Sequence, residues 1–166
     1  IRSGTADIGQ FVSYDPVTEV SSHILSRTRL VVVAAPSHPL AGAKRIAPSV
    51  LATFPFVGPP PSMFGRAVRQ VLHNAGVPDV NVVAQTNEYT PLRALVLAGV
   101  GLTCSFWTSV EQDVKSGRLA LLDVDSEPMM VDVRIAQTEH RALPPEAEPF
   151  LAFLRTDPAG SAPPSG

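Results

Sequence analysis

The stretch from Leu95 to Phe106, LVLAGVGLTCSF, holds the residues of this chain that most invite a chemical interpretation. Cys104 is the only cysteine among 166 residues, and a cysteine acts as a nucleophile when its thiol is ionised. Ionisation at neutral pH needs a cationic neighbour or a helix N-terminus, and neither stands beside Cys104 in the sequence. Cys104 lies instead in a short apolar segment, so the sequence predicts a buried, unreactive thiol.

Gly99 and Gly101 raise the question of phosphate binding. A dinucleotide-binding loop runs from strand to glycine loop to helix, which places the helix N-terminus against the pyrophosphate. Here the order is reversed, because a predicted helix ends at Gly99 and a predicted strand begins near Gly101. The carbonyl end of a helix carries a partial negative charge, so the sequence predicts that Gly99 is the left-handed residue that closes a helix.

The other reactive residue types lack the spacing that chemistry requires. No GxSxG motif supplies a hydrolase nucleophile, and Asp123 and Asp125 flank Val124 where a strand should end, which is typical of solvated charges. The histidines do not follow a metal-ligand spacing, and His38 is expected to cap a proline-bounded turn. They are His23, His38, His73 and His140. The sequence therefore predicts no catalytic residue, no metal site and no cofactor.

Composition narrows the class of protein further. A hydrophobic content of 45% with 17% charged residues is typical of a globular chain. The net charge of −2, without a basic cluster, argues against direct nucleic-acid binding by this segment. No apolar run approaches the ~20 residues of a membrane span, and a single cysteine suits a reducing compartment, so we expect a cytoplasmic protein.

Strand and helix patterns alternate along most of the chain, which predicts an α/β fold with a mainly parallel sheet. Expected strands cover 7–12, 22–35, 54–58, 80–86, 102–106, 118–124 and 130–137. Expected helices cover 47–53, 62–75, 90–98, 108–115 and 145–155, and the tail from residue 158 to 166 is expected to be disordered.

Two of these helices suggest an anion site. Ser62 is expected to cap one, and Thr90 is expected to cap the next with Pro91 at its first position. Helix N-termini that follow strands gather at one edge of an open sheet, where their N–H groups accept anions.

Six segments, in order, then carry a family resemblance. They are GTADIG (4–9), LVVVAAPSHPLAG (30–42), IAPSVLATFPFV (46–57), LVLAGVGLT (95–103), VKSGRLALLDV (114–124) and LPPEAEPFLAFL (143–154). With them the chain resembles the effector-binding domain of LysR-type transcriptional regulators. The resemblance implies a two-lobed fold of the type 2 periplasmic-binding-protein kind. Lobe I would hold residues 1–35 and 136–157, lobe II residues 36–135, and the two hinge strands would cross near Ala35–Pro36 and Arg134–Ala136.

The resemblance also implies an effector site between the lobes. The residues of this chain at the matching positions form three patches. The first patch is Phe11, Val12 and Ser13, the second is Gly58, Pro59 and Ser62, and the third is Asn87, Tyr89 and Thr90. Thr90 is the residue most expected to bind, as a hydroxyl and backbone donor to a small carboxylate or other anion.

The chain departs from the family in what precedes GTADIG. The family has a strand and a helix there, so lobe I is expected to be incomplete. The winged helix-turn-helix that binds DNA would lie outside this chain, and the full-length protein would be a homodimer or homotetramer. Phe106 and Trp107 replace a usual Leu-Pro pair and either line the cleft or pack. A transporter solute-binding protein remains the alternative, and an enzyme built on Cys104 or the Asp123 region is less favoured.

Overall fold

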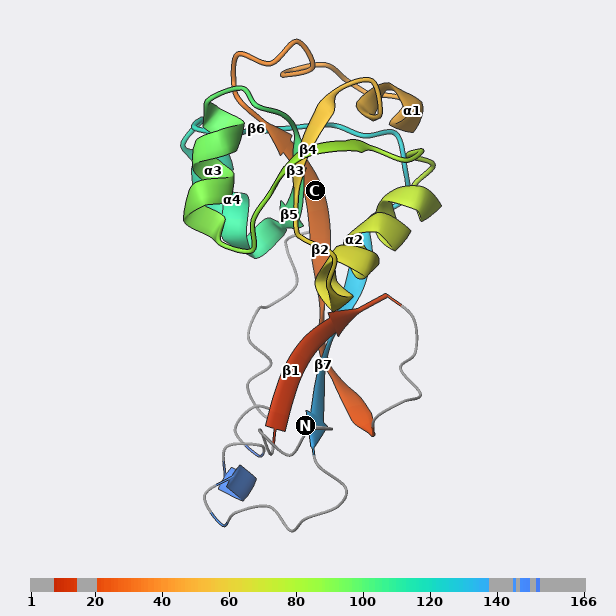
Figure 1. Ribbon diagram of the computed structural model, residues 1–166, viewed down its shortest axis with the longest axis vertical. Helices are drawn as coiled ribbons and strands as arrows, with labels where there is room; N and C mark the ends of the chain where they lie inside the picture. The colour runs from red at the N-terminus through yellow and green to blue at the C-terminus, as the bar shows by residue number, and fades with distance from the viewer. Residues whose placement is uncertain (1–7, 15–20, 138–144, 146, 150–151, 153–166) are drawn as a thin grey trace. The chain divides into compact units, whose positions relative to one another are not determined.

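The computed structural model describes residues 8–14, 21–137, 145, 147–149 and 152 (Figure 1). The chain forms two compact units: unit 1 comprises residues 1–28 and 131–166, and unit 2 comprises residues 29–130. The elements are β1 (Ile8–Ser13), β2 (Ser22–Ala34), α1 (Pro48–Leu51), β3 (Pro55–Gly58), α2 (Met63–Asn74), β4 (Asn81–Gln85), α3 (Tyr89–Leu97), β5 (Thr103–Phe106), α4 (Trp107–Lys115), β6 (Ala120–Leu121) and β7 (Met130–Gln137).

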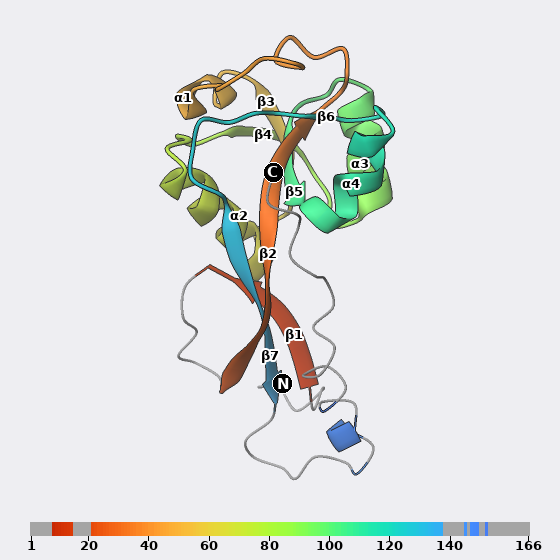
Figure 2. The same ribbon diagram turned by 180° about the vertical axis from the view of Figure 1, so that it is seen from behind.

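The second half of β2 forms the centre of unit 2. Leu30 to Ala34 are all at most 2% exposed, as the continuous apolar run predicts for a strand covered on both faces. β5 pairs with this part of β2, and β6 also pairs with β2 near its end. The helices α3 and α4 lie together on one side of these strands, and α1 and α2 lie on the other (Figures 1 and 2).

The predicted mainly parallel sheet is wrong for the described strands. The pairs β1–β7, β2–β5 and β2–β6 are antiparallel, whereas β3 and β4, connected by α2, pair in parallel. An isolated parallel bridge from Phe56 to Leu102 continues that arrangement towards β5. The sequence misleads here because an apolar strand buried on both faces has the same pattern whichever way its neighbour runs.

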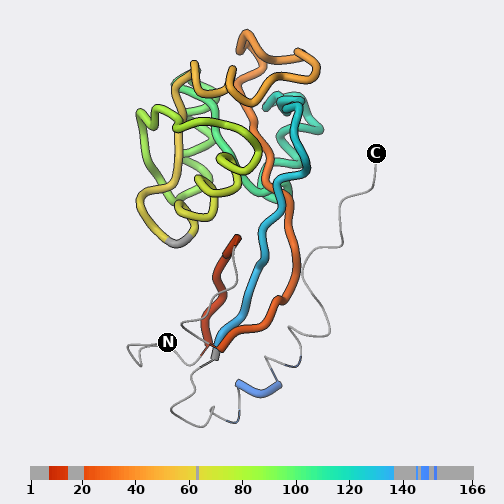
Figure 3. Tube along the Cα trace, turned by 90° about the vertical axis from the view of Figure 1, so that its right-hand side faces the viewer, coloured from red at the N-terminus to blue at the C-terminus, as the bar shows by residue number. Residues whose placement is uncertain are grey.

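Unit 1 is built on β1 and β7, which pair in register from Ile8 opposite Gln137 to Ser13 opposite Asp132 (Figure 3). β2 is the hydrogen-bonded neighbour of β7 in the same sheet, and side chains of its first half also contact β7. Arg27 Nε lies 3.0 Å from Asp132 Oδ1, and Arg134 Nε donates to Ser22 Oγ at 3.1 Å. Each of these four residues belongs to unit 1.

The chain changes unit at Thr28–Arg29 and at Met130–Val131, a few residues before the expected crossings. Of the expected hinge residues, Ala35 follows β2 and is 4% exposed, and Pro36 begins the next turn. Arg134 and Ala136 lie inside β7. Their role as a hinge stays a prediction.

Most helix boundaries follow the predicted local chemistry. The side chain of Ser62 accepts a hydrogen bond from Gly65 N at 3.0 Å and caps α2, as predicted, and α2 buries Val68, Val71 and Leu72. Gly99 has a φ of 76° and follows the last residues of α3, which confirms it as the left-handed residue that ends the helix.

Two of the predicted elements differ clearly in their bounds. Thr90 does not cap α3: the N-cap is Glu88, so Thr90 is the second helical residue and Pro91 the third. The strand expected over 118–124 is limited to β6, because the chain beyond Leu121 turns to bridge Val124 with Ile46. The expected helix at 145–155 and the tail at 158–166 fall mostly or wholly outside the described residues. None of the helices in the described part of the chain is long and apolar enough to span a membrane.

Candidate functional site

Unit 2 contains a small pocket between β5, the segment that leads into α3, and the start of α2. Its volume is about 100 Å³. β5 forms one wall with four consecutive residues, and the rest comes from short segments on either side. The lining residues are Pro59, Phe64, Thr86, Asn87, Tyr89, Leu92, Thr103, Cys104, Ser105, Phe106 and Ser109.

The lining carries no charged side chain and mixes hydroxyl and amide groups with apolar and aromatic side chains. Phe64 and Phe106 stack with their ring centroids 5.0 Å apart. Thr103 is 2% exposed, and its Oγ1 atom has no hydrogen-bond partner among the described residues. A buried polar atom without a partner costs about 1–3 kcal/mol, and the residue that carries this one lines the pocket.

The N-terminus of α3 lies beside this pocket and has no side-chain cap among the described residues. The N–H of Glu88 is bonded to Thr86 Oγ1 at 3.1 Å, and Pro91 has no N–H. The first N–H groups of a helix lack partners within the helix, so those of Tyr89 and Thr90 are donors to whatever lies in front of them. The positive end of the helix dipole favours an acceptor that carries negative charge.

A carboxylate behind the pocket wall fixes Tyr89. Asp113 Oδ2 accepts hydrogen bonds from the Tyr89 hydroxyl at 2.7 Å and from Arg93 Nε at 2.6 Å, and Asp113 Oδ1 accepts one from Arg118 Nε at 2.6 Å. The Arg93 guanidinium, then the Tyr89 hydroxyl, hold the pKa of Asp113 well below its ordinary value. Burial first, and then the bond to Asp113, raise the pKa of Tyr89 to about 12.

The structure divides the predicted site residues into three groups. Pro59, Asn87 and Tyr89 line the pocket together, whereas Gly58, Ser62 and Thr90 do not. Ser62 is occupied as a helix cap, and Thr90 is exposed. Phe11, Val12 and Ser13 lie on β1 of unit 1, where Ser13 is 6% exposed and its Oγ also has no partner among the described residues.

Sequence reasoning missed Thr103, Ser105 and Asp113. Thr103 and Ser105 stand in a predicted strand, and nothing in the strand pattern distinguishes a hydroxyl that lines a pocket from one that is bonded. Asp113 lies in a predicted helix, where an aspartate is ordinarily solvated. Of the two aromatic residues left open, Phe106 lines the pocket, and Trp107 packs against the core cluster of Val31, Val33, Val96, Val110 and Leu119.

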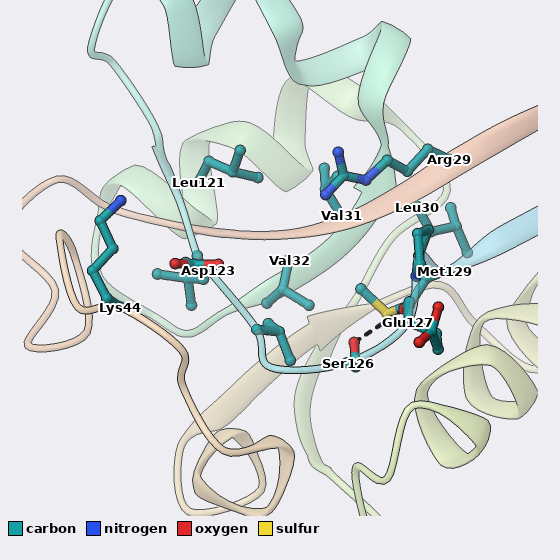
Figure 4. Close-up of a pocket in the computed structure, with 13 residues that line it drawn as sticks. Arg29, Leu30, Val31, Val32, Lys44, Leu121, Asp123, Ser126, Glu127 and Met129 are labelled. Atoms are coloured by element: carbon teal, nitrogen blue, oxygen red, sulfur yellow. Dashed lines mark hydrogen bonds between the residues drawn. The ribbon is translucent and has the colours of Figure 1, made fainter. Parts of the chain in front are cut away.

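A larger hollow of about 480 Å³ lies elsewhere in unit 2, where the chain leaves the edge of β2 (Figure 4). Leu122 N donates to Val32 O at 3.0 Å and Leu30 N to Met129 O at 2.7 Å, and the chain bulges away between these bonds. The charged residues of its rim are Arg29, Lys44, Asp123 and Glu127. The two positive and two negative charges balance, so the rim favours neither an anionic nor a cationic ligand. The smaller pocket is therefore the candidate site.

The reactive groups considered first have structural roles. Burial raises the pKa of the Cys104 thiol to about 12, so it stays protonated at neutral pH. Arg45 binds both acids of the Asp123 region, through its backbone N–H to Asp123 Oδ2 at 3.3 Å and through Nη2 to Asp125 Oδ2 at 3.2 Å. His38 Nδ1 accepts from Leu40 N at 3.2 Å, which confirms its place as a turn cap. No group of three or more metal-binding side chains occurs among the described residues.

Comparisons with known proteins define the fold and the family of this chain. The fold is similar to that of the CcmR regulatory domain of Synechocystis PCC6803 in complex with 2-PG, with a TM-score of 0.77, 21% identity, and coverage of 95% of this chain and 76% of that one. This likeness confirms the predicted α/β fold of the type 2 periplasmic-binding-protein kind. The chain matches the LysR substrate binding domain family over residues 1–159, and it belongs to that family.

Two curated relatives are transcriptional regulators. The HTH-type transcriptional regulator CbbR of Xanthobacter flavus is 25% identical over 150 residues, which cover 89% of this chain and 45% of that protein. An uncharacterized HTH-type transcriptional regulator of Mycobacterium bovis is 30% identical over 130 residues, which cover 75% of this chain and 41% of that protein. The chain therefore spans less than half the length of these relatives. They favour the sensor domain over the solute-binding protein of a transporter.

Proposed function

We propose that this chain senses a small-molecule effector for a LysR-type transcriptional regulator, and that the pocket beside β5 and α3 holds part of that effector. The observation that carries the proposal is the buried Thr103 hydroxyl, which lacks a partner among the described residues and lines a pocket next to the uncapped start of α3. A native structure keeps such a group where a ligand or a water satisfies it.

The effector we propose is a small molecule with a carboxylate or another anionic group. The N–H groups at the start of α3 and the hydroxyls of β5 can donate to such a group. No Lys or Arg lines the pocket, so neutral donors and the helix dipole would balance the charge. A pocket of about 100 Å³ favours one small polar group rather than an extended ligand.

The rest of the function belongs to the same proposal. The protein is not an enzyme, acts in the cytoplasm, and contacts DNA through a helix-turn-helix outside this chain. The full regulator is a homodimer or homotetramer. An effector can change its state only by binding two arrangements with different affinities. The unit 1 residues Phe11, Val12 and Ser13 stay predicted effector contacts.

Binding can be measured directly on this chain. Trp107 is its only tryptophan and packs against the same core cluster as Tyr89, which lines the pocket, so its fluorescence should report on the pocket. We would titrate acetate, inorganic phosphate and 2-PG, and follow both Trp107 emission and the melting temperature. Saturable binding of at least one probe that is lost in Thr103→Val would support the site, and no response to any of the three would refute an anion site.

The regulator itself needs a second measurement. The intact mass and N-terminal peptides of the protein from its own cells should reveal a helix-turn-helix ahead of Ile1. A cleaved secretory leader there would instead favour the solute-binding protein of a transporter.

A further inference from the structure

Asp113 joins three parts of unit 2 at one buried carboxylate. Its side chain is 8% exposed, and it lies near the end of α4. Tyr89 and Arg93 reach it from the first turns of α3, and Arg118 reaches it from the segment after α4. The backbone N–H groups of Arg118 and Leu119 also donate to Asp113 O, at 2.8 and 3.0 Å.

The contacts on α3 are spaced to fix its start. Tyr89 is the first residue of α3 and Arg93 lies four residues later, so both project from the same face of the helix. Both bind the same oxygen, Oδ2. A carboxylate buried with two guanidinium partners is held in one geometry, because losing either partner leaves charge poorly compensated.

This arrangement decides what Tyr89 can offer to the pocket that it lines. A phenol has one O–H proton, and Tyr89 donates that proton to Asp113. The hydroxyl therefore has no proton left to donate to an effector, so for an effector group that only accepts hydrogen bonds the ring of Tyr89 is the remaining contact surface. The donors of the pocket are then the hydroxyls of β5 and the first N–H groups of α3.

We infer that Asp113 is a positioning residue for effector binding, which turns the ring of Tyr89 towards the pocket, keeps its hydroxyl out of it, and sets the position of the α3 N-terminus. The inference rests on the proposed function of the same pocket. It also determines specificity: the effector presents an apolar or flat side to Tyr89 and its acceptor group to β5 and α3.

Three variants of the whole chain test it, with 2-PG as the probe and binding measured at least 15 °C below the melting temperature of each protein. Asp113→Asn should weaken 2-PG binding about tenfold or more, because it releases Tyr89 and the start of α3. Tyr89→Phe, which keeps the ring, should weaken it by no more than about threefold. The matched control is Asp125→Asn, which removes the same charge from an exposed ion pair with Arg45 and touches neither Asp113 nor α3, and it should stay within about twofold of wild type.

Two outcomes would overturn the inference. If Tyr89→Leu, which removes the ring, binds 2-PG as tightly as wild type, the ring is not a contact surface that Asp113 positions. If Asp113→Asn lowers the melting temperature and leaves 2-PG affinity unchanged, Asp113 is structural only.

A ligand-free measurement separates this inference from the proposed function. Only two tyrosines are present, so in Tyr14→Phe the absorbance change on alkaline titration belongs to Tyr89. Its midpoint of about 12 should fall when Asp113→Asn is added, and no fall would disprove the Tyr89–Asp113 contact. If the midpoint decreases but acetate, phosphate and 2-PG all fail to bind, the Tyr89–Asp113 contact is supported. The effector pocket and the positioning role of Asp113 are then both refuted.

Discussion

The hydroxyl of Tyr89 lies 2.7 Å from Oδ2 of Asp113, and this bond connects the first residue of α3 with the last turn of α4. The two residues are 24 positions apart in the sequence. The same carboxylate also binds Arg93 and Arg118, so one aspartate holds together the elements that form the pocket wall.

Acid should destabilise the protein through Asp113. Its pKa in the folded chain lies below the ordinary value of 3.8, so the unfolded chain takes up the proton more readily. The stabilisation is therefore complete above about pH 5 and is lost as the pH falls through about 4 towards the folded pKa. Melting temperatures from pH 7 to pH 3 should fall less steeply for Asp113→Asn than for wild type.

The same substitution should cost about 2 kcal/mol of unfolding free energy at pH 7, because hydrogen bonds to a charged group are lost. Asp125→Asn is the matched control. Asp125 forms an exposed ion pair with Arg45, so its loss should change stability by less than about 1 kcal/mol. Equal acid slopes for wild type and Asp113→Asn would contradict the assignment.

Thr103→Val should raise stability and abolish binding. The substitution removes a buried hydroxyl that has no partner among the described residues and fills the same space. We expect a gain of about 1 kcal/mol in urea unfolding together with loss of the probe-induced melting shift. Thr90→Val is the comparison, because Thr90 is exposed and keeps its backbone N–H. If Thr90→Val abolishes the shift and Thr103→Val does not, the site lies at Thr90, as the sequence alone predicted.

Gly101→Ala should disrupt the start of β5. A Cβ at Gly101 would lie 2.3 Å from Pro55 O, the atom that accepts the Leu102 N–H at 2.8 Å, so the backbone itself would have to move. We expect a loss of about 3 kcal/mol in urea unfolding. At Gly99 an added Cβ meets no described atom within 4 Å, so Gly99→Ala should cost only the strain of its positive φ, about 1 kcal/mol. Equal losses would show that the close approach at Gly101 does not matter.

Cys104 should be unreactive in the native protein. It is 4% exposed, and the pKa of about 12 keeps it protonated at pH 8. Ellman's reagent should label less than about a tenth of the chains in native buffer within the time that labels all of them in denaturant. Rapid labelling of Cys104 in the native protein would contradict this prediction and favour the hypothesis of an enzyme that uses the thiol.

Local chemistry made much of the fold predictable. Ser62, Gly76 and Gly99 set helix ends through capping and left-handed backbone, and such effects act within a few residues of the chain. The buried run from Leu30 to Ala34 was equally clear, because covering both faces of a strand removes every polar position. The family followed from the order of such segments.

What the sequence determined by itself is therefore most elements of the described part of the chain and the family. The resemblance also named three residues that line the pocket, Pro59, Asn87 and Tyr89, whose role as effector contacts stays a prediction. Only the tertiary structure decided the direction in which the strands pair, the start of α3 at Tyr89 instead of Pro91, and the meeting of Thr103 and Asp113 with that helix. The physical reason is distance along the chain. A cap or a turn is a contact between residues that are close in the sequence. The hydrogen bonds of the buried Asp113 carboxylate, and the lack of a partner for the buried Thr103 hydroxyl among the described residues, depend instead on the packing of segments that are far apart in the sequence.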